Sequence, residues 1–450
     1  MPLNPQLPKE LIHWISKPLD RFIRIETSTA ILLLLSTFVA LIMANSPWSK
    51  SFLSIWDITL GIHLGSFEFS RSIHGWINDG LMTLFFFFVS LELKREFIFG
   101  ELRKPKMAAL PIIAAIGGML VPALFYLLLQ YNEAGQNGWG TVMATDTAFV
   151  IGCLALFGKL IPQSLRIFML SLAIIDDIGA ILVVAIGYSD GISWTALIIS
   201  AIGLILVYLM RKSGIRSITI FFFIGSLIWV SVDASGIHPT ITGVILGLMT
   251  PTGAWVNDKR LNEILHHIVS FDPGEHWSGD KEDRKALQIA EVAVRETISP
   301  VERLEFLLHP WIGYLIMPLF ALANAGVPIN FSDFTNEVTI AVILGFILGK
   351  PIGVFIFSFI ADFLGLAKRP SDLNWILLAC GSILTGIGFT MAIFIANLAF
   401  NENLINSARL GIMLASIFCA LTGIFMLLIY KFFSKNRDSS MPESFSQTDR

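Results

Sequence analysis

The chain has 450 residues, of which 54% are hydrophobic and only 14% are charged. A soluble globular domain carries about 25% charged residues, so the composition excludes a typical water-soluble enzyme. The net charge of −3 offers no attraction for nucleic acid, which we do not expect as a partner. The three cysteines all lie in apolar runs, so neither a disulfide framework nor a zinc site is expected, and no cofactor is implied. The composition predicts a polytopic membrane protein in a lipid bilayer.

The order of apolar segments predicts about 12 transmembrane helices, because a helix needs roughly 20 apolar residues to cross a bilayer. The segments lie at 28–46, 75–93, 107–130, 140–158, 167–188, 194–210, 217–233, 237–250, 310–329, 337–358, 374–398 and 407–430. We therefore expect an all-α membrane domain over residues 28–430. A cytoplasmic N-terminal segment, 1–27, precedes it, and a polar, disordered cytoplasmic tail, 431–450, follows it.

The distribution of basic residues predicts the orientation of these helices. If both termini are cytoplasmic, 27 of the 31 basic residues fall on the inner side. The exceptions are Lys50, Arg71 and Arg409 outside, and Lys350 within a span. Such an excess of Lys and Arg is typical of cytoplasmic loops. We therefore expect both termini in the cytoplasm.

Two polar segments are predicted to carry structure of their own. Residues 57–70 alternate apolar and polar side chains around Gly65-Ser66, which is typical of a β-hairpin on the external side. Because a lone hairpin is marginally stable in water, we expect it to pair with a second copy of the chain; the alternative is an ordered loop lying on the helices. Residues 251–309 form a long, charged cytoplasmic loop, with helical patterns at 262–270 and 281–297.

Four charged residues lie at bilayer depth, where each charge is costly and marks a functional candidate. They are Asp146, which follows Thr145, the adjacent pair Asp176 and Asp177, and Lys350. Neighbouring side chains on a helix point about 100° apart, so one carboxylate can pair with Lys350 while the other binds a ligand. Two close acids in a low dielectric resist carrying both charges, which suits a site that holds protons or a small hard cation. Such competition is the minimal chemistry of an antiporter; the alternative is a buried structural ion pair.

Two segments have glycines and polar residues in the middle of a span. They are the stretch around Asp146, MATDTAFVIG, and residues 385–394, TGIGFTMAIF, which includes Gly386 and Gly388. Glycines here favour an unwound helix that exposes carbonyls and half-helix ends. The alternative is that they are ordinary small packing residues.

These residues lie within a series of motifs that resembles the NhaA-type sodium/proton antiporters. The motifs are WINDGLMTLFFFFVSLELKRE (76–96), IIAAIGGMLVPAL (112–124), ATDTAFVIG (144–152), LAIIDDIGA (172–180), SGIHPTITGVILG (235–247), LHPWIGYLIMPLFALANAGV (308–327), GKPIG (349–353) and GIGFTMAIFIANLAF (386–400). They occur in the family's order over nearly the whole chain. The resemblance implies an inverted-repeat fold with two broken, crossing helices. It also implies electrogenic, pH-regulated exchange of cytoplasmic Na+, and also Li+, for external H+ across the bacterial inner membrane.

The resemblance also implies roles for particular residues. Asp176 and Asp177 would bind ion and proton with Thr145, Asp146 would offset the half-helix dipoles, and Lys350 would pair with Asp176. A cytoplasmic cluster would regulate activity by pH and support pH homeostasis; it consists of Glu92, Lys94, Arg95, Glu96, Arg303, Glu305 and His309, with His238 as a further pH-linked residue. The alternative to a regulatory role is that these charged residues form a solvated belt at the membrane edge. Asp79 would lie on the cation path, and the external hairpin would form the contact of a homodimer.

Two departures from the family pattern concern regulation. Phe306 stands where the best-known member has a histidine, and the loop before Arg303 is longer than in the short members. Because of these two departures, the resemblance does not predict the pH at which the protein becomes active. The competing functions are a sodium-coupled solute symporter, a channel and, from another class, an intramembrane aspartyl protease. The protease reading lacks its motif, because Gly386-Ile387-Gly388 is followed by Phe389 instead of an aspartate.

Overall fold

The structure is a computed structural model that describes residues 26–64, 67–103, 105–155, 157, 161–188, 191, 193–215, 217–254, 256–269 and 281–438. The predicted segment 1–27 and the end of the predicted tail lie almost entirely outside these residues. The chain divides into two compact units. Unit 1 comprises residues 1–81, 104–189 and 313–450, and unit 2 comprises 82–103 and 190–312.

Unit 1 is helical apart from one two-stranded sheet. Its elements are α2 (Glu26–Ala44), α3 (Ser49–Trp56), β1 (Thr59–Leu64), β2 (Phe67–Ser72), α4 (Ile73–Gly75), η1 (Trp76–Leu81), α6 (Pro105–Leu129), η3 (Gln136–Met143), α7 (Thr147–Ala155), α8 (Gln163–Gly187), α15 (Met317–Asn324), η6 (Phe331–Thr335), α16 (Glu337–Leu344), η7 (Gly345–Gly349), α17 (Lys350–Phe363), α18 (Trp375–Leu384), α19 (Phe389–Ala399) and α20 (Glu402–Asp438). Helix α6 packs along α17, where Gly117 and Gly353 approach each other too closely for any side chain. Small residues permit this close contact between membrane helices.

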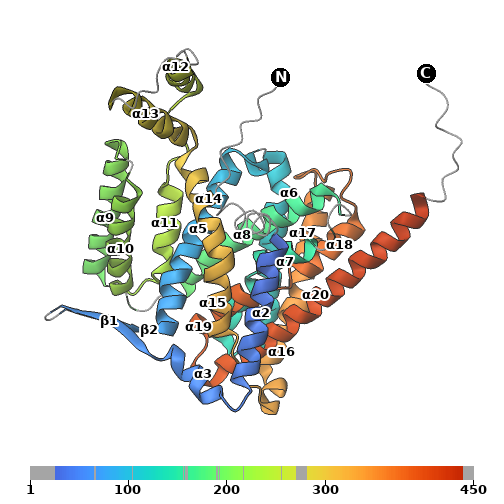
Figure 1. The fold of residues 1–450 in the computed structure, drawn as a ribbon. Coiled ribbons are helices and arrows are strands. Elements are labelled where there is room, and N and C mark those ends of the chain that lie inside the picture. Colours follow the sequence, from blue (N-terminus) through green and yellow to red (C-terminus); the bar gives the residue numbers. More distant parts are fainter. Residues whose placement is uncertain are drawn as a thin grey trace, which may run out of the picture. The chain divides into compact units, whose positions relative to one another are not determined.

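Unit 2 is entirely helical among its described residues. Its elements are α5 (Met82–Ile98), η2 (Glu101–Arg103), α9 (Trp194–Lys212), α10 (Ile218–Ala234), α11 (Thr240–Met249), α12 (Asp258–Val269), α13 (Lys281–Thr297) and α14 (Pro300–Trp311), which the π-helical turn η5 (Ile312–Ile316) continues into α15. Helix α5 packs against α11 and α14, and α9 packs against α10. Helices α12 and α13 form the pair predicted for the cytoplasmic loop (Figure 1).

The described helices agree with a polytopic membrane protein. Seven are long and apolar enough to cross a bilayer: Ile73–Ile98, Met107–Leu129, Gln163–Ala185, Trp194–Lys212, Pro300–Asn324, Glu337–Phe363 and Glu402–Phe433. The bent pair α18 and α19 makes an eighth, and three shorter apolar helices are Ser28–Ala44, Ile218–Ala234 and Thr240–Met249. The predicted twelve segments all contain helix, but a count of twelve crossings and the inverted repeat stay predictions.

The external hairpin forms where the alternation of side chains predicts it. Strands β1 and β2 are antiparallel, with Thr59 opposite Ser72 and Leu64 opposite Phe67. The indole of Trp76 donates a hydrogen bond to the carbonyl of Leu60, which ties the hairpin to the helix that follows. The strands reach Ser72, so the hairpin extends slightly beyond the predicted residues 57–70.

Two predicted boundaries differ from the structure. Helix α14 starts at Pro300 inside the predicted loop, because Ser299 and Glu302 form a reciprocal capping box. Helix α20 continues to Asp438, so the first residues of the predicted disordered tail are helical. In both cases polar residues extend a helix beyond its apolar segment, and hydropathy alone does not detect such a boundary.

Candidate functional site

The candidate site lies in unit 1, where two interrupted helical segments meet. Helix α18 ends at Leu384 and α19 begins at Phe389, with a bend of 46° between them. The second interruption separates η3, which ends at Met143, from α7. The two interruptions are joined directly, because the backbone N–H of Asp146 donates to the carbonyl of Ile387 over 2.7 Å. The predicted helix breaks are therefore present, and they contact each other.

Glycines make the break between α18 and α19 possible. A Cβ atom on Gly386 would lie 2.5 Å from the Sγ of Cys419 and 2.8 Å from the carbonyl oxygen of Phe346. A Cβ on Gly388 would lie 2.4 Å from the ring of Phe346. Both distances are shorter than ordinary contacts, so the backbone fits here only without side chains. The two glycines therefore lie in a break of the helix and also serve as small packing residues.

Asp146 caps the N-termini of two helices at once. Its Oδ1 accepts from the N–H of Phe149 in α7, and its Oδ2 accepts from the N–H of Thr390 in α19, each over 3.0 Å. The hydroxyl of Thr390 also donates to Oδ2. Helix N-termini carry partial positive charge, so a fully buried carboxylate at their meeting point offsets both dipoles. The structure thus supports the charge-offsetting role expected for Asp146.

Asp176 and Lys350 form the predicted ion pair at the centre of the site. The Nζ of Lys350 lies 2.6 Å from the Oδ2 of Asp176, and both side chains are fully buried. Lys350 also donates to the carbonyl of Met143, the last residue of η3. A cation at the negative end of a helical segment is favourable. Lys350 directly follows the π-helical turn η7; such turns are frequent at functional sites.

Threonines on either side of Asp146 each contact one carboxylate of the aspartate pair. Thr145 donates its hydroxyl to the Oδ2 of Asp176, and this hydroxyl also lies 3.1 Å from the carbonyl oxygen of Thr385. Thr147 donates its hydroxyl to the Oδ2 of Asp177 over 3.1 Å. The two aspartates therefore have different partners, as their angular separation on α8 requires.

Sequence reasoning missed one of these hydroxyls and gave another a different role. Thr147 lies in the recognised motif ATDTAFVIG but was not singled out, and Thr390 was named only as a polar residue of the helix break. Threonine is common in membrane helices as a small packing residue, so it gives a weak signal. A threonine on each side of an intramembrane aspartate was the available indication.

The charged cluster predicted to regulate activity lies in unit 2, and its members have different kinds of partner. Arg95 and Glu305 form an ion pair of 2.8 Å. The Nζ of Lys94 instead donates to the carbonyls of Leu248 and Thr250, at the C-terminal end of α11. Lys94 is therefore placed to stabilise a helix end, a role that sequence reasoning did not assign.

Arg303 has a partner outside the predicted cluster. It pairs with Glu296 of α13 over 2.9 Å, and Glu296 is only 3% exposed. Sequence reasoning assigned no role to Glu296.

Phe306, the departure from the family pattern, is 86% exposed. The ring of His309 lies 5.8 Å from that of Phe88.

The other predicted residues are His238, Asp79 and the two further acids of the cluster. His238 bonds to the hydroxyl of Thr240 over 2.7 Å, at the end of α11 opposite to the one that Lys94 caps. Asp79, in unit 1, forms an ion pair with Arg71 of β2. Glu92 and Glu96 lie on α5, within the unit that holds the cluster. None of these positions tests the predicted roles in regulation or on the cation path.

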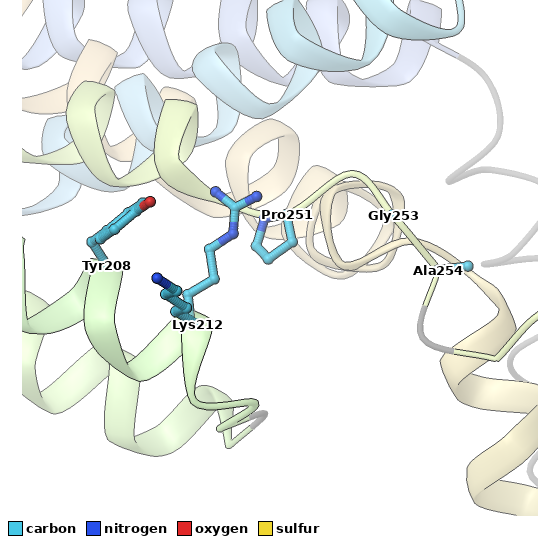
Figure 2. Close-up of a pocket in the computed structure, with 6 residues that line it drawn as sticks. Tyr208, Lys212, Pro251, Gly253 and Ala254 are labelled. Carbon is cyan, nitrogen blue, oxygen red and sulfur yellow. The ribbon is translucent and has the colours of Figure 1, made fainter.

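Unit 2 contains a hollow near the end of α9. It has a volume of about 470 Å³ and is lined by Tyr208, Arg211, Lys212, Pro251, Gly253 and Ala254. Tyr208 and Lys212 lie on one helix, and Pro251 to Ala254 lie on the segment opposite (Figure 2). Arg211 donates to the carbonyl of Met249.

The fold and the site together define a polytopic helical membrane protein with a buried pair of adjacent carboxylates. Residues 20–427 match the family described as Na+/H+ antiporter 1. The chain is 55% identical over 426 residues to the Na(+)/H(+) antiporter NhaA 2 of Acidiphilium cryptum, covering 95% of each chain. It is 54% identical over 424 residues to the Na(+)/H(+) antiporter NhaA of Rhizobium meliloti, covering 94% of this chain and 97% of the relative. The chain belongs to the Na+/H+ antiporter family.

Family membership decides between the functions left open by the sequence. The chain is a Na+/H+ antiporter and a transporter, not an enzyme, which removes the protease reading. It also favours exchange over solute symport and over a channel. The predicted resemblance is confirmed over nearly the whole chain.

Proposed function

We propose that the protein exchanges cytoplasmic Na+ for external H+ at Asp176 and Asp177, with Thr145 as a further oxygen ligand. The observation that carries this proposal is a pair of adjacent, buried carboxylates beside two interrupted helices, with a buried lysine paired to Asp176. A proton and a sodium ion compete for the same carboxylate oxygens. Binding of one therefore releases the other, which is the coupling that exchange requires.

Thr145 is suited to the site both when it holds protons and when it holds a cation. Its hydroxyl has two acceptors within reach, Asp176 and the carbonyl of Thr385. When the hydroxyl proton points to Thr385, an oxygen lone pair faces the carboxylates and can coordinate a cation. Hard cations prefer oxygen ligands, so the same set accepts Na+ and the smaller Li+.

We propose that the exchange is electrogenic. Asp177 carries one proton, and the Asp176–Lys350 pair carries a second when the site holds no cation. Two protons then enter for each Na+ that leaves, and the membrane potential contributes about 2.3 kcal/mol per charge per 100 mV. The site opens alternately to the two sides by movement of one part of the transmembrane domain, as in transporters with interrupted helices.

The charged residues of unit 2 are proposed to regulate this cycle. The Arg95–Glu305 pair lies at the end of α5, and Arg303, Glu296 and Lys94 fix the adjacent helix ends. Titration of such a group of acids and bases changes the packing of these ends and so makes activity depend on cytoplasmic pH. This serves pH homeostasis as well as sodium export.

The setting we propose is the bacterial inner membrane, with both termini in the cytoplasm and two chains in contact through the external hairpin. The placement of basic residues supports the orientation. The hairpin supports the dimer, because β1 and β2 form a sheet of only two strands, with Leu60 53% exposed. A partner strand would complete this marginal sheet.

The test is proton flux in everted membrane vesicles that respiration has acidified. We expect Na+ and Li+ to dissipate the gradient in the wild type between about pH 6.5 and 8.5, and not in Asp177→Asn at equal expression. A wild-type protein that responds to no cation at any pH would contradict the proposed exchange. A variant as active as the wild type would contradict the assignment of Asp177.

A further inference from the structure

Thr147 is the first residue of α7, directly after Asp146. Its hydroxyl donates to the Oδ2 of Asp177 over 3.1 Å. The hydroxyl of Thr145, two residues earlier, donates to the Oδ2 of Asp176. Asp177 is only 2% exposed, whereas Thr147 is partly exposed. Thr147 therefore lies at the edge of the aspartate site.

The two threonines differ in what their hydroxyls do. Thr145 lies within 3.1 Å of a backbone carbonyl as well as its carboxylate, so it can turn its proton away and act as a ligand. Thr147 directs its proton to Asp177. A hydrogen bond to a carboxylate fixes the orientation of that carboxylate and uses one of its lone pairs.

We propose that Thr147 is a positioning residue that sets the affinity of the antiporter for its cation by holding the carboxylate of Asp177. This rests on the function proposed above. Fixing the carboxylate before the ion arrives removes an ordering cost that binding would otherwise bear. It also fixes the distance from the Asp177 oxygens to the other ligands of the site. We take this fixed distance to suit Na+, the ion that the family's description names, whereas a carboxylate free to rotate adapts equally well to the smaller Li+.

The position of α7 strengthens this assignment. Thr147 begins a helix whose N-terminus is held by Asp146 through Phe149. The same carboxylate holds α19, so the start of α7 is anchored to both interrupted segments. A hydroxyl on this anchored turn has a defined place, which a positioning residue needs.

The experiment compares Thr147→Val, Thr147→Ala and Thr147→Ser in proteoliposomes of purified protein at one fixed pH. Valine preserves the shape and removes the hydroxyl, alanine removes both, and serine keeps the hydroxyl. The matched control is Thr37→Val, because Thr37 is a buried threonine of α2 whose hydroxyl bonds only to the carbonyl of Leu33 in its own helix. KM and the maximal rate are measured for Na+ and for Li+.

We expect the KM for Na+ to rise about 3- to 10-fold in Thr147→Val and Thr147→Ala, as for loss of one hydrogen bond to a charged group. The KM for Li+ rises less, and the maximal rate stays within about twofold. Thr147→Ser and Thr37→Val keep the wild-type KM for both ions.

Three results would overturn the inference. One is a wild-type KM for both ions in the variants without the hydroxyl, and another is a serine variant as impaired as valine. The third is a fall in rate and folded yield at unchanged KM, which would indicate a purely structural threonine. If the wild type itself shows no Na+-driven proton movement, the proposed function fails instead, so the two failures are distinguishable.

Discussion

Lys350 and Asp176 are charged side chains that are both removed from water, and this cost is offset only while they remain paired. Their contact of 2.6 Å and the bond from Lys350 to Met143 provide the compensation. Asp177 accepts a hydrogen bond from the hydroxyl of Thr147 over 3.1 Å. The two carboxylates therefore differ in their surroundings, and the charge of Asp176 is compensated by its contact with Lys350.

This asymmetry predicts a non-additive effect on stability. Lys350→Met leaves Asp176 buried without its cation, so we expect a loss of about 3–5 kcal/mol and a lower unfolding midpoint in detergent. Lys350→Met combined with Asp176→Asn removes both charges, and we expect it to regain most of that loss. Midpoints from thermal unfolding of the purified variants test this. Equal destabilisation of the single and double variants would show that the ion pair does not determine the stability.

The sequence identified the charged members of the site directly, and of its hydroxyl groups it missed that of Thr147. Asp146, Asp176, Asp177 and Lys350 were detectable because a charge in an apolar segment is costly and therefore rare. Thr147 gave no comparable signal, since a threonine is inexpensive anywhere in a membrane helix. Its contact with Asp177 depends on how α7 lies against α8, and local sequence does not determine that packing.

At the scale of elements, the interruption between α18 and α19 depends on glycine. The break brings the N-terminus of α19 to Asp146, so anything that displaces it also displaces the charges at the site. Gly386 and Gly388 were predicted to unwind this helix. The tertiary reason, close approach to Phe346 and Cys419, appears only in the structure.

We predict that Gly386→Ala and Gly388→Ala each destabilise the protein by about 1–3 kcal/mol and reduce transport, because an added methyl group overpacks the break. Gly191→Ala is the control, since a Cβ there meets no atom within 4 Å. Unfolding midpoints and initial rates of Na+-driven proton flux measure the two effects. Wild-type behaviour in both variants would mean that the break tolerates a side chain.

Element boundaries were less predictable than the elements themselves. Apolar runs indicated where helices lie, and alternation indicated the hairpin. The start of α14 at Pro300 and the end of α20 at Asp438 lie in polar sequence, where a capping box or continued backbone hydrogen bonding extends the helix. The stretch around η3 and α7 reads as one apolar run, yet it contains two short helical pieces.

At the scale of the whole molecule, the site proposed for ion exchange and the cluster proposed for its regulation belong to different compact units. The aspartate site lies in unit 1 and the charged cluster lies in unit 2. Variants of the cluster should therefore change the pH dependence without changing the ion-binding residues. This separation permits independent tests of regulation and of dimer formation.

The Arg95–Glu305 pair provides the test of regulation. Arg95→Glu alone places two like charges together, and we expect it to shift the activating pH, as measured by Na+-driven proton flux across pH 6.5–8.5. Arg95→Glu with Glu305→Arg restores an opposite-charge pair, and we expect the profile to return toward the wild type while the KM for Na+ at optimal pH stays the same. A single variant with an unchanged profile would rule out this pair as part of the regulation.

Cysteine cross-linking tests the proposed dimer. The cysteines of the chain are buried, so an added surface cysteine reacts against a low background. We expect Ser70→Cys, on the exposed part of β2, to form a disulfide-linked dimer in membranes. Thr335→Cys, exposed on η6, is the control that should stay monomeric. Equal cross-linking of both variants, or of neither, would argue against the hairpin as the contact.

The central claim is that Na+ and protons compete for the same carboxylates, and proton release on Na+ binding tests it most directly. Purified wild-type protein in a weakly buffered detergent solution with a pH indicator should release protons when Na+ is added, and release none when choline is added. Asp177→Asn should release few or none. Binding of radioactive Na+ to the wild type without proton release, or equal release from the variant, would contradict the account.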